Sequence, residues 1–279
     1  ACQQNWLDGC GFRADAGVSD PAKRAESESE SDAEEPEGHF DFIEVGTSNW
    51  GTLLQFCANS SWYPSSLGYK LQRLKRSSKG LRRVRGLAVE MVSELLDSLP
   101  SLPRVTKVHA AMDETDGSER FFCISGENIR RYAGRYFYQV RGSPCDVMWY
   151  AVSLGCLGAP HPELVPMMEA CQCMELLEER RIEVLSWGRL CELHGVKSVD
   201  VVQLDCEGKD CAILRGLIRH CVENPSAWPR MIQFECNKLT APSEKKATLN
   251  SLLRLGNYKV NSESHQNIVI ERKKSTRSN

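Results

Sequence analysis

Acidic side chains stand at the ends of several short apolar runs in this 279-residue chain. Glu44 lies near the end of the run FIEV, Glu90 closes GLAVE, and Asp205 directly follows VDVVQL. Glu207 comes two residues later, and Glu235 closes MIQFE. The carboxyl ends of parallel strands meet at one edge of a sheet, and open α/β sheets bind their ligands there. We therefore expect these acids to share one site.

The stretch DFIEVGTSNWGTLL predicts a strand, a tight turn at Gly46 and a helix from Gly51 to Cys57. Gly46 would let the backbone come close to a ligand. Glu44 places a carboxylate where a phosphate-binding GxGxxG loop needs small uncharged residues. Such a charge repels phosphate and favours a cationic ligand, for example S-adenosylmethionine.

Glu90 is the candidate acceptor for the hydroxyls of a ribose, the role of an acid that closes the second strand of a nucleotide site. Such an acid normally follows the glycine turn by about 20 residues, whereas Glu90 follows Gly46 by 44. The basic segment 60–85 accounts for the difference if it loops out of the fold. The alternative is an ordinary acid at the start of the helix predicted over 92–98, stabilised by the helix dipole.

A hydroxyl acceptor needs a general base, for which the candidates are Asp205, Glu207, Glu235 and His161. His161 lies in the segment 127–164, which is rich in aromatic residues, glycine and proline. That segment predicts either a lid or acceptor pocket or irregular packing. We predict no metal, although carboxylates at a strand edge can also hold a divalent cation.

Further elements follow from hydrophobic periodicity, end caps and turn residues. The predicted strands and extended segments are Val105–Ala110, Phe121–Ile124, Ile182–Leu185, Val199–Leu204, Met231–Phe234 and an antiparallel pair, Tyr258–Val260 with Asn267–Ile270. The predicted helices are Val165–Glu179, Trp187–His194 between a Ser186 cap and a Gly195 stop, Cys211–Cys221 with Asp210 as its cap, and Glu244–Leu255 ended by Gly256-Asn257.

The hydrophobic content of 41% allows one sizeable α/β core. Seven carboxylates between Glu26 and Glu37 predict that residues 1–38 are a disordered acidic tail, with an acidic interaction arm as the alternative. The folded domain is expected over 39–271, interrupted by the basic insertion 60–85 and followed by a loose basic tail, 272–279. Eight Lys or Arg between Lys70 and Arg85 favour a surface loop or basic helix. No base-reading module accompanies them, so we expect no nucleic-acid partner.

The thirteen cysteines form no CxxC pair, which favours buried reduced thiols over a disulfide framework or a zinc site. No apolar run reaches the roughly 18 residues of a membrane span. The first residues, ACQQNWLDGC, lack the pattern of a signal peptide. These features favour a cytoplasmic location, with a small-molecule acceptor as the expected partner.

Taken in order, the blocks resemble the FkbM-type S-adenosylmethionine-dependent methyltransferases over roughly His39 to Glu271. The blocks are FIEVGTSNWGTLL, GLAVE, KVHAAM, IEVLSWGRLCELHGVKSVDVVQLDCEGKDCAIL and MIQFECN. The fourth is the most specific, because an S-W helix, an H-G turn, an apolar strand and D-x-E-G-x-D follow at the family's spacing. The resemblance implies a Rossmann-like class I methyltransferase sandwich, with a mostly parallel seven-stranded sheet of order 3-2-1-4-5-7-6, an antiparallel final strand and helices on both faces. It also implies S-adenosylmethionine as cofactor and methylation on oxygen of a sugar or another small hydroxylated acceptor.

The resemblance also implies roles for single residues. Glu44, Gly46 and Gly51 would belong to the first cofactor motif, Glu90 with Met91 would hold the ribose, Ala111 and Met112 would edge the adenine, and Asp205 would be the acid after the fourth strand.

Two other functions compete with methyl transfer. A binding or scaffold protein could keep the fold without turnover and join its partners through the acidic tail and the basic insertion. A nicotinamide oxidoreductase is disfavoured, because Glu44 stands where the GxGxxG loop needs uncharged residues.

Overall fold

The computed structural model describes residues 36–47, 85–98, 104–140, 142–152, 154–236, 238–264 and 267–273. The acidic tail up to residue 35, the predicted helix 51–57 with Gly51, the basic insertion up to residue 84 and the end of the basic tail lie outside these residues.

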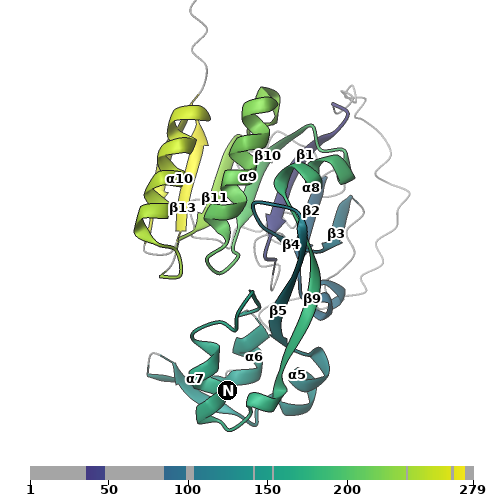
Figure 1. Ribbon diagram of the computed structural model, residues 1–279, viewed down its shortest axis with the longest axis vertical. Coiled ribbons are helices and arrows are strands. Elements are labelled where there is room, and N and C mark those ends of the chain that lie inside the picture. Colours follow the sequence, from purple (N-terminus) through teal and green to yellow (C-terminus); the bar gives the residue numbers. More distant parts are fainter. Residues whose placement is uncertain are drawn as a thin grey trace, which may run out of the picture. The chain divides into compact units, whose positions relative to one another are not determined.

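A seven-stranded sheet carries most of the described core (Figure 1). Its strands are β1 (His39–Val45), β2 (Gly86–Glu90), β3 (Val105–His109), β10 (Ser198–Leu204), β11 (Met231–Glu235), β12 (Tyr258–Glu263) and β13 (Asn267–Arg272). Their order is β3-β2-β1-β10-β11-β13-β12, which reads 3-2-1-4-5-7-6 when the seven are numbered along the chain. The sheet is mixed, since β1, β2, β3, β10 and β11 pair in parallel and β13 is antiparallel to both β11 and β12.

Burial explains why β1 and β10 lie at the centre of this sheet. Val201, Val202 and Leu204 of β10 are fully buried, and β1 buries Phe42 and Ile43 to the same extent. Strands buried on both faces lose the alternation of polar and apolar residues and become continuous apolar runs. Because β1 and β10 run parallel, their carboxyl ends deliver the residues that follow them to the same edge of the sheet.

Four helices accompany the sheet: α4 (Ser93–Ser98), α8 (Trp187–His194), α9 (Asp210–Glu223) and α10 (Pro242–Leu255). Leu214 of α9 and Leu252 of α10 share one hydrophobic cluster with strand residues such as Ile232. The predicted caps of α8 are confirmed. Ser186 Oγ accepts a hydrogen bond from the Arg189 N–H at 3.2 Å, and Gly195 ends the helix in the left-handed region at φ 63°.

A second sheet and a group of helices occupy the chain between β3 and α8. The sheet, ordered β4-β9-β5-β8, contains β4 (Ala111–Met112), β5 (Gly117–Ile124), β8 (Cys156–Leu157) and β9 (Leu177–Leu185). Between β5 and β9 lie α5 (Gly126–Tyr132), the hairpin β6 (Phe137–Val140) with β7 (Ser143–Asp146), α6 (Val147–Val152), α7 (Leu164–Ala170) and a 3-10 turn, Met174–Leu176. We call residues 125–176 the insertion, as distinct from the basic insertion 60–85.

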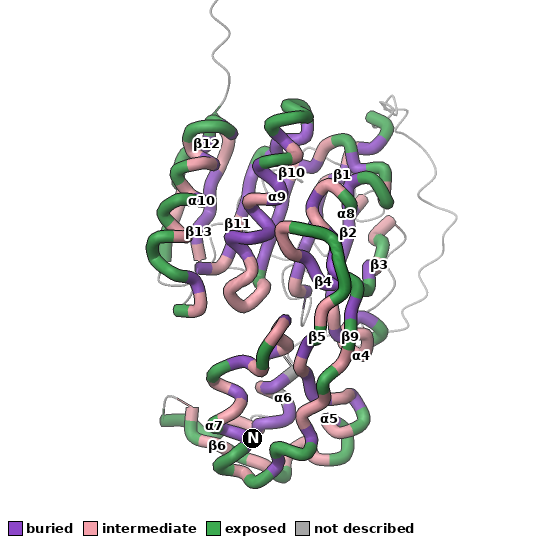
Figure 2. The backbone as a smooth tube through the Cα atoms, in the orientation of Figure 1, coloured by how far each residue is buried: buried purple, intermediate pink, exposed green. Residues whose placement is uncertain are grey.

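The insertion has its own hydrophobic cluster, which includes Ile129, Met148, Leu164 and Met168. Figure 2 shows buried backbone along α6 between the more exposed elements around it. For residues 127–164 the sequence predicted either a loop-rich lid or acceptor pocket or irregular packing. Tertiary burial of its apolar side chains gives it regular structure that local pattern alone does not indicate.

The predicted helix Val165–Glu179 is wrong in its second half. The helix α7 ends at Ala170, and Gln172 takes a positive φ of 53°, which a continuing helix does not allow. The chain then enters β9, whose residues 177–184 pair antiparallel with β5. The two extended segments predicted at Phe121–Ile124 and Ile182–Leu185 are thus parts of two longer strands that pair with each other.

None of the described helices is both long and apolar enough to cross a membrane.

Candidate functional site

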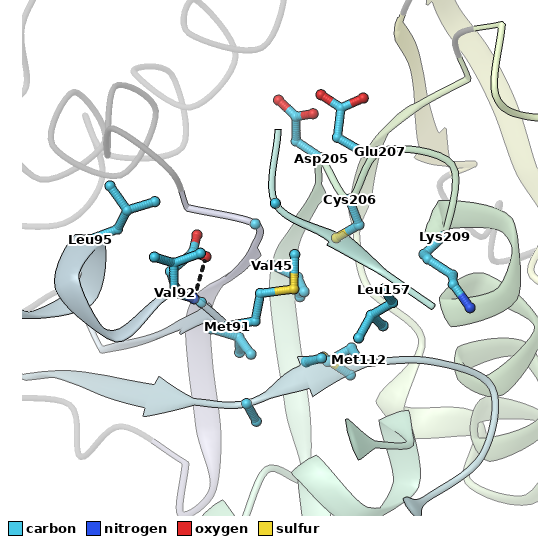
Figure 3. Close-up of a pocket in the computed structure, with 16 residues that line it drawn as sticks. Val45, Met91, Val92, Leu95, Met112, Leu157, Asp205, Cys206, Glu207 and Lys209 are labelled. Carbon is cyan, nitrogen blue, oxygen red and sulfur yellow. Dashed lines mark hydrogen bonds between the residues drawn. The ribbon is translucent and has the colours of Figure 1, made fainter. Parts of the chain in front are cut away.

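A cleft opens at the carboxyl ends of β1, β2 and β10 (Figure 3). Its lining residues come from the ends of strands, from α4 and from the chain around β8: Val45, Gly46, Val89, Glu90, Met91, Val92, Leu95, Ala110, Ala111, Met112, Gly155, Leu157, Asp205, Cys206, Glu207 and Lys209. The strand-end acids Glu90, Asp205 and Glu207 do come together there.

Gly46 follows β1 and contacts the ends of both neighbouring strands, β2 and β10. Its φ of +76° lies in the left-handed region, and a Cβ at this position would overlap with the backbone carbonyl oxygen of Asp205. Its N–H donates to the Val89 carbonyl at 3.0 Å, while the Asp205 N–H donates to the Val45 carbonyl at 3.1 Å. We expected this glycine to admit a ligand, but its immediate role is to let the turn after β1 lie against the turn after β10.

Glu90 closes β2 and reaches the cleft although its side chain is only 5% exposed. Its Oε1 accepts a hydrogen bond from the Val92 N–H at 2.9 Å. The contact with the amide just before α4 agrees with the helix-start alternative. The position in the cleft wall agrees with a ligand-binding acid, and one carboxylate has enough acceptor sites for both roles.

Glu44 does not line the cleft. Its side chain is 3% exposed, and burial raises its pKa well above the ordinary value, with smaller contributions from the charges of Asp205 and Glu90. Among the described residues no group hydrogen-bonds its Oε2. Because burial favours the uncharged acid, the expectation that Glu44 presents a negative charge to a ligand does not fit its position.

The apolar wall contains the predicted Met91, Ala111 and Met112. Ala111 and Met112 form β4, which pairs with the end of β9. The sequence interpretation missed Val92, Leu95, Gly155 and Leu157. The last two approach the cleft from the insertion, and no local signal marks residues that only a long-range approach brings to a site.

Three carboxylates lie together at this edge, since one oxygen each of Asp205, Glu207 and Glu235 falls within 4.8 Å of the others. Figure 3 shows the Asp205 and Glu207 carboxylates side by side. Asp205 is an exposed residue, yet partial desolvation and the negative charge of Glu207 raise its pKa to about 6, against a hydrogen bond with Glu235. Such a group can accept a proton near neutral pH, and the three oxygens are also of the kind that hold a divalent cation.

His161 lies beside the cleft rather than in its wall. Its side chain is 2% exposed, and its Nε2 is 3.3 Å from Glu207 Oε2. Lys209, which the sequence interpretation missed, does line the cleft, and its Nζ is 2.6 Å from Asp113 Oδ2. The cleft wall therefore holds three carboxylates and one ammonium, and that ammonium is paired with a fourth carboxylate.

Comparisons with known proteins add little to this geometry. No family model matches the chain, and no curated protein matches it. The crystal structure of methyltransferase FkbM from Methylobacillus flagellatus KT aligns with a TM-score of 0.38 and 10% identity, over 84% of this chain and 44% of that protein. The chain thus spans less than half the length of that protein, and a likeness this weak decides neither family nor activity.

Proposed function

We propose that this chain is an S-adenosylmethionine-dependent methyltransferase that methylates an oxygen of a small hydroxylated acceptor. The observation that carries the proposal is the cleft at the carboxyl ends of β1, β2 and β10, with a buried acid at the end of β2 and two acids after β10. Open parallel sheets bind nucleotide-like ligands at this edge, beside the point where the strand order reverses.

The cleft residues fit the cofactor by charge and by apolar surface. Glu90 would accept hydrogen bonds from the ribose hydroxyls, and Met91 and Met112 offer apolar surface to the adenine. Asp205 and Glu207 favour a ligand that carries a sulfonium and an ammonium. The same carboxylates repel a pyrophosphate, which disfavours a nicotinamide dinucleotide.

When bound, S-adenosylmethionine supplies a methyl group that its sulfonium already activates for displacement. The protein then has to align the acceptor oxygen with the methyl carbon, exclude water and remove the hydroxyl proton. Asp205 is the proposed base, because a pKa of about 6 leaves its carboxylate ionised at neutral pH yet more basic than an ordinary aspartate. One oxygen each of Glu235 and Glu207 lies within 4.8 Å of an Asp205 oxygen, which makes them the alternative bases.

Calorimetry with S-adenosylmethionine, S-adenosylhomocysteine and NAD tests the proposal. The two adenosyl ligands should bind and NAD should not. Binding of NAD alone would favour an oxidoreductase, and a folded protein that binds none of the three would favour a scaffold without turnover.

Glu90→Gln tests the ribose contact with little change in shape. Losing a hydrogen bond to a charged acceptor costs about 1.5–3 kcal/mol, so we expect S-adenosylhomocysteine to bind at least about tenfold more weakly. Asp97→Asn is the matched control, because Asp97 is exposed on the adjoining helix α4. Equal affinities for Glu90→Gln and wild type would place the ribose elsewhere.

A further inference from the structure

His161 is held in one orientation by its neighbours in the sequence and in space. It lies between Pro160 and Pro162, and a proline restricts both its own φ and the residue before it. Its Nδ1 is 3.1 Å from the backbone N–H of Glu163. A backbone N–H can only donate, so Nδ1 is the acceptor and the ring proton is on Nε2.

The protonated Nε2 faces Glu207. With Nε2 3.3 Å from Glu207 Oε2, the imidazole donates its single ring N–H to the carboxylate. Because Nδ1 accepts from the Glu163 backbone, the ring is neutral in this arrangement and leaves the full negative charge on Glu207. The contact orients the carboxylate without cancelling its charge.

The backbone of Glu207 is also fixed in an uncommon conformation. Its φ of 45° lies in the left-handed region, which non-glycine residues adopt only where the surrounding structure imposes it. The next residue, Gly208, has a φ of 92°, and a Cβ there would lie 2.9 Å from the Cβ of Leu239. The turn after β10 therefore aims the Glu207 side chain in a defined direction, into the cleft wall and within reach of His161.

The loop that carries His161 is tied down on two further sides. Glu163 Oε2 accepts a hydrogen bond from the Tyr150 hydroxyl at 3.0 Å, and Glu163 Oε1 forms an ion pair with Lys238. Tyr150 belongs to α6 of the insertion, and Lys238 follows β11 of the seven-stranded sheet. The loop thus presents His161 from the insertion to the carboxyl edge of the sheet.

We propose that His161 is a positioning residue that holds the Glu207 carboxylate where the sulfonium of S-adenosylmethionine binds. This inference rests on the proposed function, and it changes the role of His161 from a candidate base to a support for one of the cleft acids. A carboxylate near the sulfur stabilises the positively charged cofactor more than the neutral product, S-adenosylhomocysteine.

The two ligands provide a test that needs no acceptor, because they differ by one methyl group and one positive charge. We expect Glu207→Gln to lower the ratio of S-adenosylmethionine to S-adenosylhomocysteine affinity about three- to tenfold, as the loss of one nearby charge. His161→Asn should lower the ratio in the same direction, because its Oδ1 can still accept from the Glu163 N–H while its amide is too short to reach Glu207. His161→Gln, whose terminal amide extends as far as Nε2, should restore most of the preference.

The double variant His161→Asn/Glu207→Gln should match Glu207→Gln alone, since both changes act on one carboxylate. His220→Asn on α9 is the control, with both affinities unchanged. Glu207→Asp, which keeps the charge but shortens the reach to His161, is a second test that leaves the His161 loop intact and should also lower the ratio.

A normal ratio in Glu207→Gln, in Glu207→Asp or in a folded His161→Asn would overturn the inference. An equal loss of both affinities in His161→Asn would also overturn it, because a purely structural role predicts that result. If the wild-type protein binds neither ligand, the proposed function fails and this inference fails with it, which is distinct from binding without a change in ratio.

Discussion

Asp210 shows how one buried carboxylate joins the elements around the cleft. The sequence predicted a cap for α9, but Asp210 is the first residue of that helix and its side chain is fully buried. Its Oδ2 accepts from the Cys206 N–H at 3.1 Å and its Oδ1 from the Glu235 N–H at 2.9 Å. It thereby ties the turn after β10 to the end of β11, where the candidate base Asp205 and its neighbour Glu235 lie.

The ionisation of Asp210 should make stability depend on pH. Burial raises its pKa from the ordinary 3.8 to about 7, against the backbone hydrogen bond from Glu235, while the charge of Asp205 raises it further. A raised pKa means that the folded state holds the proton more tightly than the unfolded state. The resulting stabilisation is complete below about pH 4 and is lost as the pH rises through about 7.

We therefore expect the unfolding free energy of the wild type, relative to that of Asp210→Asn, to fall from pH 4 to pH 8, by up to about 1.4 kcal/mol per pH unit. Urea unfolding at a series of pH values measures it. Val222→Ala, an exposed change on the same helix, should keep the wild-type profile. A difference that stays constant across this range would show that Asp210 does not titrate between the two states.

At the scale of elements, we call the paired strands β5 and β9, which lead into and out of the insertion, its stem. Arg180 joins this stem to the helix after β2. Its guanidinium donates to both oxygens of Glu94, at 2.9 and 2.8 Å, from β9 to α4. Glu94 Oε1 also accepts from the Gly126 N–H at 3.3 Å, at the start of α5. The hydrogen bond from Arg180 is the main reason that the pKa of Glu94 is lowered to about 2.

Removing this charge should weaken the attachment of the insertion. Glu94→Gln is expected to lower the unfolding free energy by about 1–2 kcal/mol at pH 7, the lower part of the range for charged hydrogen bonds because both side chains are partly exposed. A lowered pKa stabilises the fold above about pH 4.5, and this contribution is lost as the pH falls through about 2. The difference between Glu94→Gln and wild type should therefore shrink in acid.

Urea unfolding at pH 7 and pH 3 measures both parts of this prediction, with Asp97→Asn as the exposed control on α4. A difference that grows in acid would contradict the assigned sign. No loss of stability at pH 7 would show that the apolar contacts of the stem hold it without the ion pair.

At the scale of the whole molecule, two parts of the chain build one cleft. The seven-stranded sheet supplies the acids Glu90, Asp205 and Glu207, whereas the insertion supplies Leu157 to the wall and His161 behind Glu207. Under the proposed function, changes in the insertion should therefore alter acceptor choice while the cofactor contacts of the sheet stay in place.

The acidic segment before Pro36 should add nothing to this unit. Residues 26–35 of this segment carry six carboxylates and no large apolar side chain that could bury surface. Residues 36–38 differ, because the Gly38 carbonyl accepts from the Lys197 N–H at 2.8 Å. Deleting residues 1–35 should leave the melting temperature unchanged within error in a thermal scan, and a large drop would show that the segment packs on the core.

By itself, the sequence determined the elements whose causes are local. The apolar runs of β1, β2, β10 and β11, the Ser186 and Gly195 ends of α8, and the acid that closes β2 all follow from periodicity and capping within a few residues. The shared edge of Glu90 and Asp205 followed too, because parallel strands place their carboxyl ends together.

Only the tertiary structure decided which of these acids face a ligand and what supports them. Glu44 looks equivalent to Glu90 in the sequence, yet its burial at the sheet centre raises its pKa and removes it from the cleft wall. His161 meets Glu207 across 46 positions and Lys209 meets Asp113 across 96. The first pair depends on how a separately packed insertion approaches the sheet, and the second on how the chain after β4 lies against the turn after β10. Local propensity and periodicity carry no record of that approach, because each describes only neighbours along the chain.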